Sequence, residues 1–168
     1  MKILIERKRQ IIMSLGIFLI NYVFDRFTKY IAVEYLKGNE ARSFFNIFVL
    51  VYAENTGAFL SLGKNWNIYI KYVVLLIIPI IICIAGLFYL MIKEKLNYRI
   101  IICSCIIGGG IGNLADRLFN EFTVIDFMNF GIGNIRTGIL NTADISVTFG
   151  VILLIIFEMI QRKKQISS

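Results

Sequence analysis

The chain has 168 residues, of which 58% are hydrophobic and none is histidine, and its mean hydropathy is +0.75. A soluble domain of this length does not have so apolar a composition, so the sequence predicts a membrane protein. The absence of histidine excludes a Ser/His/Asp triad, a Cys/His pair and an HExxH zinc site. The net charge of +7 does not indicate nucleic-acid binding, because the basic residues stand beside the apolar runs and form no single stripe.

Four apolar stretches are long enough to cross a bilayer, which takes roughly 20 residues. We expect helices at about 11–33, 72–92, 100–118 and 145–160, joined by long loops at about 34–71 and 119–143, within one integral membrane domain of residues 1–168. The first stretch holds Asp25, Arg26 and Lys29 and lacks a small-x-small cleavage site. It is therefore interpreted as a retained anchor and not as a cleaved signal peptide.

Basic residues cluster in three short segments, which precede the first stretch, separate the second from the third, and follow the fourth. By the positive-inside rule these segments are cytoplasmic, so both termini lie inside and both long loops lie outside. The three cysteines lie within the second and third stretches, where apolar filling is the expected role. The three segments contain Lys2, Arg7, Lys8 and Arg9; Lys93, Lys95 and Arg99; and Arg162, Lys163 and Lys164; the cysteines are Cys83, Cys103 and Cys105.

Five polar clusters remain, and all but VIDF have a structural interpretation when taken alone. DRFTK predicts an i,i+4 ion pair with snorkelling side chains, and ENTGAF predicts a turn. GNLADR predicts an Asp116–Arg117 pair, and LNTAD predicts a helix cap. The predicted topology nevertheless places all five at the outer face, whereas unrelated structural features would be free to fall on either side. The clusters are DRFTK (Asp25–Lys29), ENTGAF (Glu54–Phe59), GNLADR (Gly112–Arg117), VIDF (Val124–Phe127) and LNTAD (Leu140–Asp144).

Two acids of these clusters, Asp126 and Asp144, suit an aspartyl hydrolase. Asp126 stands among apolar neighbours, which predicts partial desolvation and a raised pKa. Two carboxylates close together do not both ionise readily, so one holds a proton while the other activates a water. This chemistry requires neither a metal nor a covalent enzyme intermediate.

The motifs DxxTK, NxGAF, GGxxGNxxDR, VxDF and NxAD occur in this order from the first apolar stretch to the last. In this combination the chain resembles the lipoprotein signal peptidase family, also called signal peptidase II. The resemblance implies an aspartyl endopeptidase of the bacterial inner membrane that cuts prolipoproteins before a diacylglyceryl-modified cysteine. It also implies an all-α membrane protein with four transmembrane helices and a small β-rich extracytoplasmic cradle between helices 1 and 2, which the FFNIFVLVY run fits.

By the same resemblance, Asp126 and Asp144 form the catalytic dyad. The implied partners are lipid-modified prolipoproteins and membrane lipid, with no cofactor and no nucleic acid, and we expect a monomer. The resemblance carries supporting roles to Asp25, Lys29, Asn55, Gly57, Gly112, Asn113, Asp116, Arg117, Asn141 and Ala143.

Three departures from the family pattern affect the outer loops. The segment between Arg117 and Asp126 is one residue longer than the common spacing, Asn129 replaces a second acid, and Leu140 replaces a phenylalanine. They put the local loop geometry and the substrate preference in doubt, but not the dyad.

Other classes of protein account for the sequence less well. A proton- or ion-coupled carrier would spread its acids along a path across the bilayer, but the inner halves of the predicted spans contain a single acid, Glu158. An assembly subunit accounts for the Asp25/Lys29 pair but leaves Asp126 unexplained. A presenilin-type enzyme needs GxGD, whereas this chain has GIGN at Gly131–Asn134.

Overall fold

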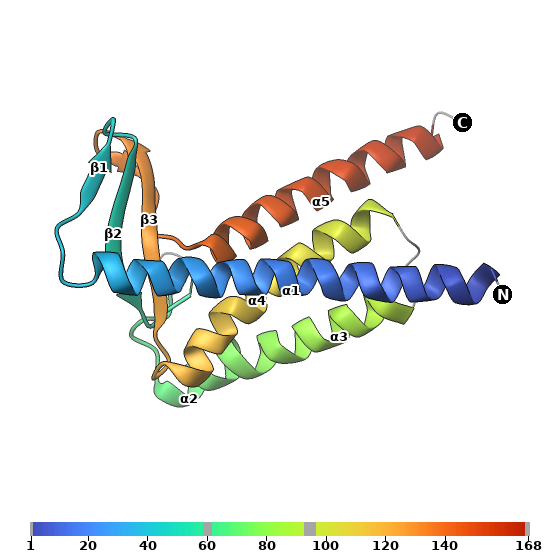
Figure 1. Ribbon diagram of the computed structural model, residues 1–168, viewed down its shortest axis with the longest axis horizontal. Helices are drawn as coiled ribbons and strands as arrows, with labels where there is room; N and C mark the ends of the chain where they lie inside the picture. Colours follow the sequence, from blue (N-terminus) through green and yellow to red (C-terminus); the bar gives the residue numbers. More distant parts are fainter. Residues whose placement is uncertain (1, 59–61, 93–96, 167–168) are drawn as a thin grey trace.

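The computed structural model describes residues 2–58, 62–92 and 97–166, and within them four helical rods run side by side (Figure 1). The rods are α1 (Lys2–Leu36), the segment Ile68–Ile92, α4 (Tyr98–Phe119) and α5 (Thr142–Ile166). Each contains a window long and apolar enough to cross a membrane, as predicted. The helices extend several residues beyond the predicted bounds, because polar residues at their ends continue the helical hydrogen bonding. The predicted basic turn residues Lys93 and Lys95 lie outside the described residues.

The second rod changes its helical type along its length. It begins as α2 (Ile68–Tyr72), continues through a π-helical turn (Val73–Ile77) and ends as α3 (Ile78–Ile92). Pro79 follows the wide turn and has no N–H to donate to a carbonyl of the preceding turn, which favours a local change of hydrogen-bond spacing. This turn matters because Leu75 and Pro79 line the cavity described below.

Beside the helices lies an antiparallel sheet of four strands in the order β1-β2-β3-β4. The strands are β1 (Arg42–Phe44), β2 (Phe48–Asn55), β3 (Val124–Ile132) and β4 (Ile135–Arg136). The predicted β-rich cradle between helices 1 and 2 therefore exists only in part, since two strands come from the loop between α4 and α5. A lone hairpin leaves a strand edge unpaired, and β3 covers the free edge of β2. The rest of the described chain is mostly helical, as predicted.

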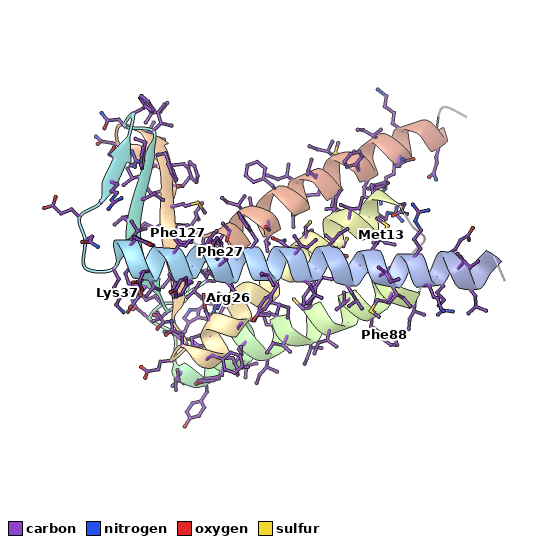
Figure 2. All side chains as sticks on the ribbon, in the orientation of Figure 1. Met13, Arg26, Phe27, Lys37, Phe88 and Phe127 are labelled. Carbon is purple, nitrogen blue, oxygen red and sulfur yellow. The ribbon has the colours of Figure 1, made fainter. Side chains whose placement is uncertain are left out.

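The third helical rod, α4, is the centre of the bundle. In its most apolar window 44% of the residues are buried inside the protein, compared with 11% in each of the other three rods. Its glycines permit this, because a Cβ at Gly109 would lie 2.9 Å from the carbonyl oxygen of Ala143. The glycine run Gly108–Gly110 therefore lets α4 pack closely against its neighbouring helices. Outward faces of the rods carry exposed apolar side chains, as Figure 2 shows along α1 and α3.

Both chain ends lie at one end of the bundle, and the sheet lies at the other (Figure 1). The C-terminal end of α1, the C-terminal end of α4 and the N-terminal end of α5 all meet the sheet. The described residues of the five polar clusters are therefore gathered at one end of the protein. Phe59, the last residue of the second cluster, lies outside the described residues.

Candidate functional site

The N-terminus of α5 is closed by a reciprocal pair of hydrogen bonds. The side-chain oxygen Oδ1 of Asn141 accepts from the backbone N–H of Asp144 (3.0 Å), and Oδ2 of Asp144 accepts from the backbone N–H of Asn141 (3.0 Å). This is the geometry of a capping box, in which Asn141 is the N-cap and Asp144 the third helical residue. The predicted helix cap is thus formed, with Asn141 as the capping residue. One oxygen of Asp144 remains for another partner.

Asp126 faces the same region from β3. A bulge in β2 between Leu50 and Ala53 shifts the register, so that Ala53 pairs with Asp126. Asn55 then lies diagonally across from Asp126 on the same face of the sheet, and its Nδ2 donates to Oδ2 of Asp126 at 3.0 Å. The sheet thus places an amide donor on the second acid, which is 2% exposed.

Two asparagines connect the acids. Nδ2 of Asn113 donates to Oδ1 of Asp144 at 2.9 Å, and Nδ2 of Asn141 donates to Oδ1 of Asp126 at 2.6 Å. Nδ2 of Asn141 also reaches Oδ1 of Asn113 at 3.0 Å, which closes a continuous chain of hydrogen bonds between the two carboxyl groups. A charged carboxylate is stabilised by such donors.

Asp126 and Asp144 line one cavity of about 220 Å³ at the junction of helices and sheet. Burial, together with the negative charge of Asp144, raises the pKa of Asp126 to about 6. The predicted rise in the pKa of Asp126 is confirmed. The other lining residues are Asn55, Ala58, Leu75, Pro79, Cys83, Gly110, Asn113, Leu114, Arg117, Val124, Ile139 and Leu140.

A cluster of four buried or half-buried charges lies directly behind the cavity. Lys29 Nζ is 2.9 Å from Asp25 and 2.8 Å from Asp116, and Arg26 bridges the same two acids at 3.1 and 2.6 Å. Lys29 is 2% exposed, so the predicted snorkelling was wrong, because facing acids make burial the better environment. Asp116 pairs with these cations and not with Arg117, which corrects the second predicted ion pair. Two positive and two negative charges balance.

This ionic cluster is tied to the acids through Asn113 and through α5. Lys29 Nζ donates to Oδ1 of Asn113 at 2.7 Å, which directs the Nδ2 group of Asn113 to Asp144. Asp25 accepts from the backbone N–H of Ala143 at 3.0 Å, satisfying one of the free N–H groups at the start of α5. A Cβ at Gly112 would collide with the carboxyl group of Asp25, so glycine is needed for the close approach of α1 and α4.

Arg117 enters the cavity from α4. Its Nη2 donates to the carbonyl of Gly57 at 2.7 Å, and the N–H of Gly57 donates to Oδ1 of Asn55 at 2.9 Å. The ENTG turn therefore connects Arg117 to the asparagine that contacts Asp126. Nε of Arg117 is buried and has no hydrogen-bond partner among the described residues. The structure thus brings all twelve predicted site residues into one connected region.

The sequence prediction missed two contributors, Arg26 and the Thr28–Thr142 pair. The hydroxyl groups of the threonines lie 2.8 Å apart, and that of Thr142 donates to Asp25 at 2.9 Å. Arg26 gave a usable signal, since a charge inside an apolar stretch needs a partner. The threonines gave none, because they belong to elements 114 positions apart in the sequence.

Three apolar rods packed around a fourth, α4, with a polar cavity at one end, define a multi-pass membrane protein with an internal carboxylate site. The family described as signal peptidase (SPase) II matches residues 17–160. The chain therefore belongs to the signal peptidase II family and is a transmembrane protease.

Curated relatives and solved structures agree with this family. The lipoprotein signal peptidase of Borrelia hermsii is 37% identical over 166 residues, covering 95% of this chain and 96% of that protein. The lipoprotein signal peptidase of Borreliella afzelii is 37% identical over 158 residues, with 90% and 92% covered. A solved bacterial membrane enzyme superposes with a TM-score of 0.76 at 28% identity, covering 90% of each chain, and a second has a TM-score of 0.71.

Proposed function

We propose that the protein is an aspartyl endopeptidase that removes signal peptides from prolipoproteins, with Asp126 and Asp144 as its catalytic dyad. The observation that carries the proposal is the chain of hydrogen bonds from Asp144 through Asn113 and Asn141 to Asp126 in one cavity. Two buried acids in one cavity also interact through their charges, so they titrate as a pair.

In the proposed mechanism Asp144 is charged and Asp126 is protonated. The raised pKa of Asp126 favours its protonated form. Both acids accept amide hydrogen bonds, but Asp144 also accepts from the backbone N–H of Asn141 and lies in the first turn of α5, where a negative charge is favoured. Asp144 removes a proton from a water, which attacks the scissile carbonyl, while Asp126 donates its proton to the carbonyl oxygen. When the tetrahedral intermediate collapses, the carbon–nitrogen bond breaks, Asp144 gives its proton to the leaving amine, and Asp126 takes a proton back from a hydroxyl group of the intermediate.

Arg117 is the neighbouring group that can stabilise the developing charge. Its Nη2 is held by the carbonyl of Gly57 and its buried Nε has no protein partner among the described residues. A fixed cation beside a carbonyl that gains negative charge lowers the barrier without reorganisation. Arg117 thus positions and polarises the scissile carbonyl, while the two aspartates transfer protons.

The proposed substrate is a prolipoprotein whose cysteine carries a diacylglyceryl group, with cleavage directly before that cysteine. The name of the related enzymes, lipoprotein signal peptidase, supports the substrate class. A lipid-anchored cysteine lies near the headgroup level, and the site lies at the end of the bundle next to the sheet (Figure 1). We place that end at the extracytoplasmic face of the bacterial inner membrane, because the basic segments flank the other end.

The test is cleavage of a diacylglyceryl-modified prolipoprotein by purified protein in lipid, beside its unlipidated form. Wild type cuts the lipidated form before the cysteine, and Asp126→Asn and Asp144→Asn lose this activity while remaining folded. Near-native cleavage by either variant would refute the dyad. Equal cleavage of both substrates would refute the lipid requirement but leave the dyad intact.

A further inference from the structure

A further cavity lies between the C-terminal end of α1 and the sheet, which crosses that end of the helix (Figure 1). Its volume is about 330 Å³, within the range of roughly 300–1,000 Å³ in which proteins bind small molecules. Its lining comes from one face of α1, from β1 and β2, and from Phe127 of β3. We call it the α1–sheet groove.

The α1–sheet groove has an apolar floor and an open rim. Ala32, Leu36 and Phe127 form the floor, where they are buried in one core cluster. Ile31 and Phe44 line the groove at its rim and are exposed. Large apolar side chains that stay exposed around an apolar hollow mark a place where a ligand or a partner binds.

This groove is distinct from the carboxylate cavity, because the two have in common none of the described residues that line them. Asp126 lines the cavity, whereas Phe127, the next residue of β3, lines the groove, since successive side chains of a strand point to opposite faces. Thr28 also lines the groove, and its hydroxyl lies 2.8 Å from that of Thr142 at the start of α5. The groove therefore contacts β3 and reaches the start of α5 without opening into the cavity.

The groove lies at the level where the hydrocarbon of a bilayer gives way to headgroups. It follows the last turns of a membrane-spanning helix from Thr28 to Leu36, a length of about 12 Å at 1.5 Å per residue. Tyr35 lines this stretch and is exposed, as is typical of tyrosines at a membrane interface. An apolar groove at this level faces the acyl chains of the surrounding lipid.

One cation stands at the mouth of the groove. Of the described residues that line it, Arg42 alone is charged, and it is exposed. Arg42 forms no ion pair with a residue that the structure describes, whereas the preceding basic residue, Lys37, pairs with Glu54 at 3.2 Å. A guanidinium group matches the geometry of a phosphate and binds it through two parallel hydrogen bonds.

We infer that the α1–sheet groove binds one acyl chain of an anionic phospholipid of the surrounding bilayer, with the headgroup phosphate on Arg42. The apolar floor matches the acyl chain, and the unpaired cation at the mouth matches the phosphate. An anionic headgroup is favoured over a zwitterionic one, in which the phosphate already has a cation of its own. The inference concerns a second site and does not depend on the proposed peptidase activity.

The charge at the mouth selects a phospholipid over the diacylglyceryl group of the proposed substrate. A diacylglyceryl group on a cysteine has no phosphate for Arg42 to bind. Its cysteine is also held at the carboxylate cavity, which lies on the other face of β3. A phospholipid in the groove packs against Phe127, and so it supports the strand that carries Asp126.

Native mass spectrometry and thermal unfolding test the inference. Wild-type protein in mild detergent is titrated with phosphatidylglycerol and, as the zwitterionic control, with phosphatidylcholine that has the same acyl chains. We expect one phosphatidylglycerol to bind more tightly than any further lipid. Because a ligand that binds only the folded state stabilises it, phosphatidylglycerol should raise the melting temperature more than phosphatidylcholine does.

Two pairs of variants separate the headgroup contact from the acyl contact. Arg42→Gln should weaken the tight phosphatidylglycerol roughly fivefold, the contribution of one cation beside anionic lipid. Lys64→Gln removes an exposed lysine outside the groove lining and should leave its affinity unchanged. Ile31→Trp fills the groove and should abolish the tight site, whereas Val23→Trp, at an exposed position of α1 outside the groove, should retain it.

Each outcome decides for or against the inference. Equal affinity of wild type and Arg42→Gln, or equal binding of the two lipids, would overturn the assignment of the phosphate to Arg42. Unchanged binding in Ile31→Trp would overturn the groove as the site. If a lipidated prolipoprotein bound to Asp144→Asn protein displaced the tight phosphatidylglycerol, the groove would belong to the substrate's acyl chain, whereas retention of both would uphold the inference.

Discussion

The side chains of Asn141 and Asp144 each accept a hydrogen bond from the backbone N–H of the other residue. The helix cap of α5 and the candidate dyad therefore share Asp144. Asn141→Ala removes this cap and also the donor to Asp126 at 2.6 Å. Losing a buried hydrogen-bond partner costs about 1–3 kcal/mol, so we expect kcat to fall by roughly tenfold to a hundredfold. Cleavage kinetics and thermal unfolding in detergent measure the two effects.

A matched control is available in another capped transmembrane helix. Asn97 caps α4, where its Oδ1 accepts from the N–H of Arg99 at 2.8 Å, far from the carboxylate cavity. Asn97→Ala should lower stability by about 1 kcal/mol, as for other caps, without lowering kcat. If Asn141→Ala behaved in the same way, its contact with Asp126 would not contribute to catalysis.

Asp126→Asn should stabilise the protein above pH 6. The pKa of Asp126 is raised to about 6 from 3.8, so the folded state favours the protonated form. Between pH 3.8 and about pH 6 the folded state therefore binds more protons than the unfolded state. The free energy of unfolding of the wild type falls as pH rises through this range. Asparagine carries no charge, so Asp126→Asn should raise the free energy of unfolding by up to roughly 3 kcal/mol above pH 6. This gain should disappear below pH 4, where Asp126 is protonated in both the folded and the unfolded state. Melting curves at pH 4 and pH 7 should show this difference, and a gain that is equal at both would contradict it.

Gly112→Ala should disrupt the contact between α1 and α4. The added Cβ would collide with the carboxyl group of Asp25, which also accepts from the N–H of Ala143. We expect a lower melting temperature and reduced cleavage together. Gly16→Ala is the control, because a Cβ there meets nothing within 4 Å, and alanine stabilises a helix by up to about 1 kcal/mol over glycine. Equal effects of the two substitutions would show that the close approach at Gly112 is unimportant.

The sequence predicted the four helices and the residues of the site better than it predicted their contacts. Apolar length and basic flanks are local signals in the sequence. They were therefore enough to predict the four helical rods and to predict that the polar clusters gather at one end of the bundle. The partners of Asp116 did not, because Arg26 and Lys29 come from a helix about ninety positions away. The Asn55–Asp126 bond depends on the bulge in β2, which has no clear signature in the strand's composition.

Lys29→Met should be among the most destabilising single substitutions. It leaves Asp25 and Asp116 with one cation between them and frees Oδ1 of Asn113 from its charged donor. Breaking a buried ion pair costs about 3–5 kcal/mol. Lys37→Met removes an exposed lysine that pairs with Glu54 at 3.2 Å, and no measurable change is expected. Thermal unfolding compares the two directly, and a small effect of Lys29→Met would mean that Arg26 alone balances both acids.

The ionic cluster also sets an order for biogenesis. Asp25, Arg26 and Lys29 leave the ribosome in the first helix, but Asp116 and the N-terminus of α5 emerge only about ninety and about 117 positions later. Each such charge is costly at the centre of a bilayer, by roughly 2.5–3.5 kcal/mol on insertion scales. Until α4 arrives, the outer part of the first helix is expected to stay near the headgroups, where a cysteine at Phe27 would react with a membrane-impermeant maleimide. Protection of that cysteine should appear only in nascent chains that extend past α4. The contacts of the ionic cluster can therefore form only near the end of synthesis.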